Sequence, residues 1–173
     1  MTIPIHLSMT DIQHSQLKSH LLPSDGKEAV AFLACSRRAG DRRHKLIVKE
    51  IFKVPHSACS IRTKNMVKWP VEIIEPLLEK ALDEELSLFK IHSHPSDLPS
   101  FSTTDDLSDT ELLPILKGWA EHEYPHGSLI MLSDGQIFGR YIKEDKTFSS
   151  LTSVSIVGDD ITFWYSQNIG DSS

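Results

Sequence analysis

Residues 90–106 read Lys90-Ile91-His92-Ser93-His94-Pro95-Ser96-Asp97-Leu98-Pro99-Ser100-Phe101-Ser102-Thr103-Thr104-Asp105-Asp106, and this stretch decides both the fold and the chemistry expected of the chain. Its two histidines end an apolar run and project to the same face of an extended chain, where both imidazoles can reach one ion. Asp105 follows in the predicted first turn of a helix. Two neutral nitrogens and one carboxylate leave the fourth position of a tetrahedral zinc ion open for water, as in catalytic zinc sites.

Simpler interpretations of the same residues exist. A His-x-His pair alone is common, and Ser102 and Asp105 also fit a helix N-cap with its capping partner. The two roles are compatible, because a carboxylate held at a helix start is rigid. The conjunction favours a metal site: His-x-His-Pro is followed by Pro-x-x-Ser-x-x-Asp after a predicted strand. A metallo-β-lactamase-type motif is not continued by Pro95-Ser96-Asp97, and a histidinol-phosphatase-like barrel needs more ligands and a longer chain.

These residues resemble the signature of the JAMM (JAB/MPN+) metalloprotease family, Glu…His-x-His-Pro…Ser-x-x-Asp. The matching positions are His92, His94, Pro95, Ser102 and Asp105, with the spacing between His94 and Asp105 that the family has. The resemblance implies that His92, His94 and Asp105 bind a Zn²⁺ cofactor.

The family's glutamate opens an upstream strand, and the segment 23–35 fits this description with Glu28 as the counterpart. The segment departs from the family where Ala34 and Cys35 replace a usual glycine near the strand end. Glu50, at the far end of the next predicted strand, is the alternative.

The resemblance also implies a fold and an activity. The fold is a cytidine-deaminase-like JAB/MPN domain of the α/β (α+β) class over residues 1–173, in which helices flank a mixed, mostly antiparallel sheet. The activity is that of a deubiquitinase-like hydrolase that cleaves after the C-terminal glycine of a ubiquitin-like protein, in deconjugation or precursor processing. Zinc-activated water would attack, Glu28 would serve as general base and then general acid, and Ser102 would donate a hydrogen bond to the oxyanion.

The resemblance leaves more than one function open. The short chain resembles bacterial stand-alone members, which implies as partners a ubiquitin-like protein or its conjugates and the activating and conjugating enzymes of the same operon. Asn65–Trp69 and Trp119–Pro125 are the expected walls of the substrate groove. The alternative is a non-catalytic MPN-type interaction scaffold, whose hallmark is loss of the ligands present here. A branch that acts on another amide, or in DNA repair, is a third hypothesis.

The composition indicates a globular protein without a nucleic-acid or membrane partner. Of 173 residues, 39% are hydrophobic and 24% are charged, and the formal net charge is −6. This balance does not favour nucleic-acid binding. We expect a cytoplasmic protein, because no secretory signal and no apolar run of about 20 residues occur. Cys35 and Cys59 do not form a disulfide framework.

Hydrophobic periodicity and turn signals predict the remaining elements. We expect a helix opened by a capping box at Thr10, with Ile12, Leu17 and Leu21 facing inward. A longer helical stripe covers Met66 to Leu86, and the helix after the motif should stop at Pro114. A type I′ turn at Asp134-Gly135 is expected to join two strands into a hairpin. The predicted strands are Thr2–Met9, Lys27–Arg37, His44–Val54, Leu88–Ile91, the hairpin strands Ser128–Leu132 and Gln136–Lys143, and one or two strands in Thr152–Trp164.

Overall fold

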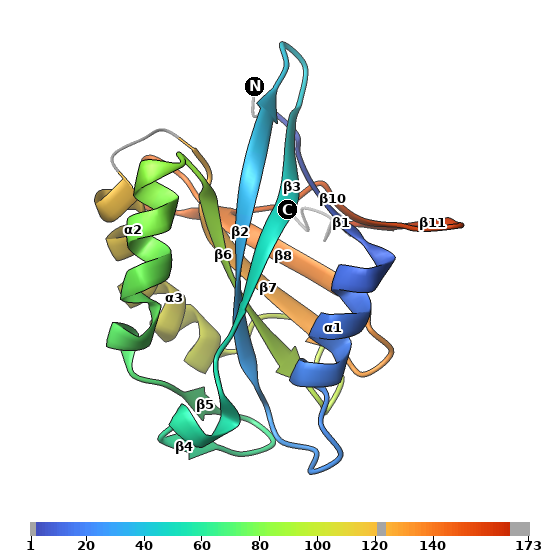
Figure 1. Ribbon diagram of the computed structural model, residues 1–173, viewed down its shortest axis with the longest axis vertical. Helices are drawn as coiled ribbons and strands as arrows, with labels where there is room; N and C mark the ends of the chain where they lie inside the picture. Colours follow the sequence, from blue (N-terminus) through green and yellow to red (C-terminus); the bar gives the residue numbers. More distant parts are fainter. Residues whose placement is uncertain (1–2, 121–123, 167–173) are drawn as a thin grey trace, which may run out of the picture.

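The computed structural model describes residues 3–120 and 124–166, and these form one large sheet with helices on both faces (Figure 1). The sheet has nine strands in the order β11-β10-β1-β3-β2-β6-β7-β8-β9. Five of its eight strand pairs are antiparallel and three are parallel, which confirms the predicted mixed sheet. Its strands are β1 Ile5–Thr10, β2 Val30–Ala39, β3 His44–Lys53, β6 Ser87–His94, β7 Gly127–Leu132, β8 Ile137–Ile142, β9 Phe148–Ser150, β10 Ser153–Val157 and β11 Ile161–Tyr165.

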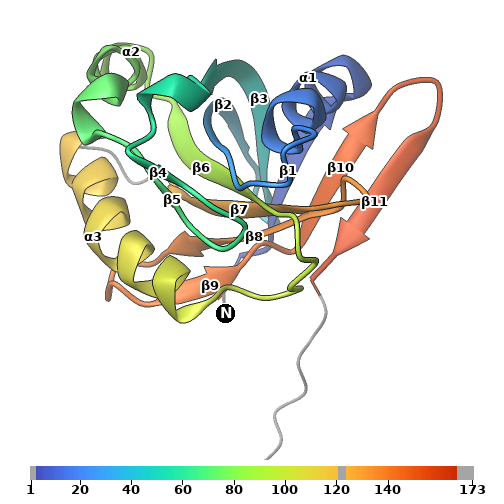
Figure 2. The same cartoon turned by 90° about the horizontal axis from the view of Figure 1, so that it is seen from below.

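The helices divide between the two faces of the sheet, and each face has its own hydrophobic core. Helix α1 (Asp11–Leu21) lies on one face, and α2 (Glu75–Asp83) and α3 (Thr103–Ala120) lie on the other (Figures 1 and 2). Leu17 and Leu21 of α1 belong to the first core, whereas Leu113 of α3 belongs to the second. No helix in the described part of the chain is long and apolar enough to cross a membrane.

Strand β6 lies between the two cores, and every one of its residues is buried. Its side chains alternate between the faces, as strand geometry requires. Phe89 and Ile91 pack in the core under α1, and Leu88 packs in the core under α2 and α3. By the same alternation, Lys90, His92 and His94 point to the α2/α3 face, so both motif histidines lie on one side of the sheet.

A small second sheet lies beside the end of β6 that carries the histidines. Its strands are β4 (Ile61–Arg62) and β5 (Val67–Lys68), and the Thr63 carbonyl at their turn accepts the Glu28 N–H at 2.8 Å. A 3₁₀ turn at His56–Ala58 precedes this small sheet, and another at Val71–Ile74 connects it to α2. The predicted helix over 66–86 is therefore wrong in its first half: the helix proper is α2.

Pro76 explains where α2 begins. It occupies the first turn of the helix, where the missing N–H costs nothing. Pro114, in contrast, does not end α3, which continues to Ala120. Leu113 and Leu116, on either side of this proline, are fully buried. Packing of that face on the sheet therefore outweighs the loss of one helix hydrogen bond.

Two further local predictions need correction. The capping box at Thr10 is confirmed, because Gln13 N–H donates to its hydroxyl and the Gln13 side chain accepts the Thr10 N–H. Ile12, however, is 68% exposed. It lies five residues before Leu17, which places it on the opposite face of the helix. The hairpin turn is also not type I′, since Gly135 has a positive φ of 91° and Asp134 does not.

Candidate metal centre

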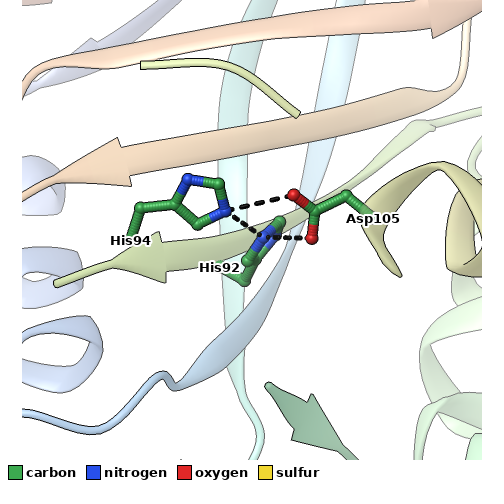
Figure 3. Close-up of side chains that lie close together, drawn as sticks. All are labelled: His92, His94 and Asp105. Atoms are coloured by element: carbon green, nitrogen blue, oxygen red, sulfur yellow. Dashed lines mark hydrogen bonds and ion pairs between the residues drawn. The ribbon is translucent and has the colours of Figure 1, made fainter. Parts of the chain in front are cut away.

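His92, His94 and Asp105 converge on one point between β6 and the start of α3 (Figure 3). The two Nε2 atoms of the histidines are 3.1 Å apart. Asp105 Oδ1 lies 2.9 Å from His92 Nε2, and Oδ2 lies 3.1 Å from His94 Nε2. All three side chains are buried. The motif therefore brings together the side chains that the sequence pattern predicted, as a group that could hold a metal ion.

Neighbouring groups fix the orientation of His94 and Asp105. The His94 Nδ1–H donates to the Leu98 carbonyl at 2.8 Å, so Nε2 carries the lone pair when the ring is neutral. Asp105 and Ser102 cap each other, because the Ser102 N–H donates to Asp105 Oδ2 at 2.7 Å and the Asp105 N–H donates to Ser102 Oγ at 3.1 Å. The capping box expected for Ser102 is thus present, and it holds the carboxylate rigidly toward the imidazoles.

The donor set fits zinc. With a neutral His94, a nitrogen lone pair faces a carboxylate oxygen, an arrangement that needs a cation or a proton between them. Donors at the zinc distance of about 2.0–2.1 Å in a tetrahedron lie roughly 3.3 Å from one another, close to the separations between His92, His94 and Asp105. Two nitrogens and one carboxylate leave a fourth position for substrate or water.

Burial and hydrogen bonds set the protonation of the three groups in opposite directions. Burial lowers the pKa of His92, which keeps the neutral form that ligates metal. Burial opposes protonation of His94, but its hydrogen bonds to Asp105 and Leu98 outweigh burial and raise its pKa. Burial would raise the pKa of Asp105, yet the hydrogen bonds from both imidazoles hold that pKa far below its usual range. The carboxylate is therefore ionised at every physiological pH.

Glu28 lies beside this cluster, just before β2. Val30 pairs with His92, and the Ser93 N–H donates to the Ala29 carbonyl at 3.2 Å. This antiparallel register, continued by one residue, sets Glu28 opposite His94 on the α2/α3 face. The Glu28 side chain is 5% exposed, and burial raises its pKa to about 7. A carboxyl group that titrates near neutrality lies next to the three candidate ligands.

Glu50, the alternative glutamate, lies elsewhere. Its carboxylate forms an ion pair with Lys80 at 2.6 Å, and its side chain is 44% exposed. Glu50 does not line the pocket that contains Glu28 and the candidate ligands. The geometry therefore favours Glu28 over Glu50 as the counterpart of the family's glutamate.

A pocket of about 30 Å³ opens onto the cluster, with room for one or two water molecules. Asn65, Met66, Val67 and Trp69, all in the first segment expected to border the substrate groove, form one wall of this pocket. Trp119, in the second, does not line it, and residues 121–123 lie outside the described residues. The remaining lining residues are Glu28, Val30, Lys90, His92, Thr104, Asp105 and Ser108.

Sequence reasoning missed several residues around the site. Phe32 was given no role, yet it packs edge-to-face on Trp69 of the first expected wall segment, with ring centroids 5.0 Å apart, and so fixes one wall of the pocket. Lys90 and Ser108 received no role, although both line the pocket. The available signal in the sequence was a lysine, Lys90, inside the apolar run 88–91. His126 is fully buried, and its Nδ1 accepts the Leu88 N–H at 3.0 Å.

Comparison with known proteins identifies the family. The model of the prokaryotic homologues of the JAB domain matches residues 11–148, which include Glu28, His92, His94, Ser102 and Asp105. The chain is a prokaryotic JAB-domain protein. No curated protein matches the sequence of this JAB domain.

A solved structure supports the fold of the JAB domain. The solution structure of protein DSY2949 from Desulfitobacterium hafniense is similar, with a TM-score of 0.52 and 14% sequence identity. The match covers 88% of this chain and 94% of that one. At this identity the likeness shows a shared fold alone.

Proposed function

We propose that this JAB domain is a zinc-dependent isopeptidase or peptidase that cleaves after the C-terminal glycine of a ubiquitin-like protein. One observation carries the proposal: the buried carboxyl group of Glu28 shares a water-sized pocket with His92 and Asp105. An interaction scaffold has no need for a buried acid that titrates at neutral pH beside a metal-ligand set.

In this proposal the residues of the chain divide the chemistry among them. His92, His94 and Asp105 would hold the zinc ion, which would supply Lewis-acid polarisation of the carbonyl and a water with a pKa of about 7. Glu28 takes the proton of the attacking water and returns it to the leaving amine, as its near-neutral pKa permits. The Ser102 hydroxyl accepts the Asp105 N–H and keeps its own proton to donate to the oxyanion.

The shape of the pocket supports a glycine at the cleavage site. The space beside Glu28 is about 30 Å³ and is walled by Met66 and Trp69, so it suits a residue without a side chain. Strand β5 pairs only with β4 among the described strands, which leaves its outer edge to form main-chain hydrogen bonds with an extended tail. The C-terminus of a ubiquitin-like protein has both properties.

The proposed setting is the bacterial cytoplasm. Cys35 and Cys59 are both unpaired, as expected in a reducing compartment. The partners would be the ubiquitin-like protein or its conjugates, together with activating and conjugating enzymes of the same operon.

The test uses a bacterial ubiquitin-like protein extended by a peptide beyond its terminal glycine. We expect the purified protein to cleave after that glycine, and a chelator to abolish cleavage. Glu28→Gln should lower kcat by at least about 100-fold because it removes the general base. Glu50→Gln is the matched control and should leave the rate unchanged. Zinc binding without cleavage of the fusion or of an isopeptide conjugate would instead favour a non-catalytic scaffold.

A further inference from the structure

A second contact joins β6 to α3 beside the metal ligands. Lys90 Nζ lies 2.6 Å from Asp109 Oδ1 and also donates to the Ser108 hydroxyl at 3.2 Å. The side chains of Lys90 and Asp109 are 5% and 0% exposed. A fully buried ion pair of this kind is unusual, and neither charge takes part in the proposed chemistry.

The spacing of this pair matches that of the ligands. Lys90 precedes His92 by two residues on β6, a step of about 6.7 Å along a strand. Asp109 follows Asp105 by four residues on α3, a step of about 6.0 Å along a helix. Both pairs of residues lie on facing surfaces of their elements. The Lys90–Asp109 and His92–Asp105 contacts are therefore two successive connections between the same strand and helix.

Arg140 completes the charge balance from β8. Its Nε and Nη2 donate to Asp109 Oδ2 at 3.0 and 2.7 Å, and its Nη1 donates to Asp106 Oδ1 at 2.7 Å. Its guanidinium lies 3.7 Å above the ring centroid of Phe101, the residue before Ser102. Arg140 thus contacts α3 just after the ligand Asp105, at Asp106 and Asp109, and also the loop that leads into the helix, at Phe101.

Register across the sheet brings the two cations together. Lys90 pairs with Ser128 of β7, and Ser128 pairs with Arg140 of β8. The three side chains therefore share one face of the sheet, below α3. The small serine leaves room for both cations to reach Asp109, so Asp109 is held from two strands at once.

Stability alone does not explain such a cluster. Replacing a buried ion pair with apolar residues of similar volume is often neutral or stabilising, whereas leaving one buried charge unpaired is strongly destabilising. A slip of α3 by one turn, about 5.4 Å, would separate Asp109 from Lys90 and leave a buried charge unpaired. The cluster therefore selects one position of α3 on β6.

We infer that Lys90 and Asp109, with Arg140 as the second cation, are positioning residues: they set the register of α3 on β6 and so hold Asp105 at ligand distance from the two histidines before a metal ion binds. This inference rests on the metal site of the proposed function. It assigns the cluster a role in metal affinity and coordination geometry, without contact to the substrate.

The test is zinc affinity, measured by competition with a chelator, together with the visible absorption bands of the Co²⁺-loaded protein. In the double variant Lys90→Met/Asp109→Leu both charges of the buried pair disappear together, and Arg140, which loses Asp109, keeps its ion pair with Asp106. We expect this variant to fold, to bind zinc about 10–100-fold more weakly, and to show altered Co²⁺ bands. Arg140→Gln should weaken zinc binding less than the double variant does.

Lys117→Ala is the matched control. It removes another ion pair between α3 and the rest of the domain, to Glu144, three turns beyond the ligand. Zinc affinity of this variant should equal that of the wild type. A folded double variant with zinc affinity and Co²⁺ bands of the wild type would overturn the inference. Should the double variant not fold, unchanged zinc affinity in Arg140→Gln would overturn it equally.

The outcomes separate this inference from the proposed function. Wild-type protein that binds zinc in a manner sensitive to Lys90 and Asp109, but cleaves no ubiquitin-like fusion or conjugate, contradicts the function and supports the inference. If the wild-type protein cleaves and the variants bind zinc as well as it does, the function is supported and the inference is contradicted.

Discussion

Glu28 is the residue on which the proposed chemistry depends, and its burial lowers the stability of the fold when its carboxyl group is ionised. Burial raises its pKa from 4.5 to about 7, and the charge of Asp105 nearby acts in the same direction. A group whose folded pKa is raised contributes stability below its unfolded pKa and loses it as the pH rises through the folded value. A free-energy cost of burying an ionisable group is typical of active sites.

This linkage gives a prediction for the metal-free protein. Between pH 4.5 and about 7 the wild type should lose stability that the Glu28→Gln variant keeps, because glutamine has no charge to bury. Urea unfolding in the presence of a chelator measures the difference at pH 4 and pH 8. The variant's gain in stability over the wild type should be larger at pH 8 than at pH 4. An equal gain at both pH values would show that Glu28 is not held in a desolvated site.

Ser102 combines a structural and a chemical role, and the two can be measured separately. Ser102→Ala should cost about 1 kcal/mol of stability through the lost N-cap, and lower kcat about 100–1,000-fold through the lost oxyanion donor. Thr10→Ala is the matched control, since Thr10 caps α1 through an equivalent capping box on the other face of the sheet. It should reduce stability similarly and leave kcat intact. Equal kcat in the two variants would limit Ser102 to capping.

At the scale of elements, the histidine strand and the helix that follows were predictable because their signals are local. The His-x-His spacing sets both rings on one face of β6, and Ser102 with Asp105 marks the start of α3. The first half of the helix predicted over 66–86 failed because Val67 and Lys68 pair with β4 as strand β5, and Val71–Ile74 form a 3₁₀ turn. An apolar stripe alone does not reveal such pairing. The same limit applies to Pro114, whose local cost is outweighed by distant packing.

Packing of α3 on the sheet carries that helix past its proline, and this can be tested directly. Leu113 is fully buried between α3 and the sheet, whereas Leu107 on the same helix is 66% exposed. Leu113→Ala should lower the free energy of unfolding by about 2–5 kcal/mol, and Leu107→Ala should change it by less than about 0.5 kcal/mol. Chemical denaturation measures both. Comparable losses in the two variants would contradict the assigned packing face.

At the scale of the whole molecule, the sequence predicted the mixed sheet and the convergence of His92, His94 and Asp105. It did not predict the cluster of Lys90, Asp109 and Arg140. Those residues lie far apart in the chain, and their contact depends on the register of α3 on β6 and of β6, β7 and β8 on one another. No local spacing encodes such a register, so the cluster becomes visible only in the folded structure.

Metal binding should stabilise the entire fold, because the ligands come from two elements that separate on unfolding. At a free zinc concentration 100 times the dissociation constant, the gain is about 2.7 kcal/mol, which raises Tm by about 5–10 °C for a chain of this size. Thermal unfolding with zinc and with a chelator measures this shift. His92→Ala should show little or no shift between the two conditions; a full shift in that variant would place the stabilising ion elsewhere.

The most direct test of the metal centre is a crystal structure of the zinc-loaded protein with anomalous diffraction data collected at the zinc absorption edge. We expect one peak within about 2.0–2.2 Å of His92 Nε2, His94 Nε2 and an Asp105 carboxylate oxygen. A peak at any other set of side chains, or no peak in crystals grown with zinc, would contradict the assignment of this site.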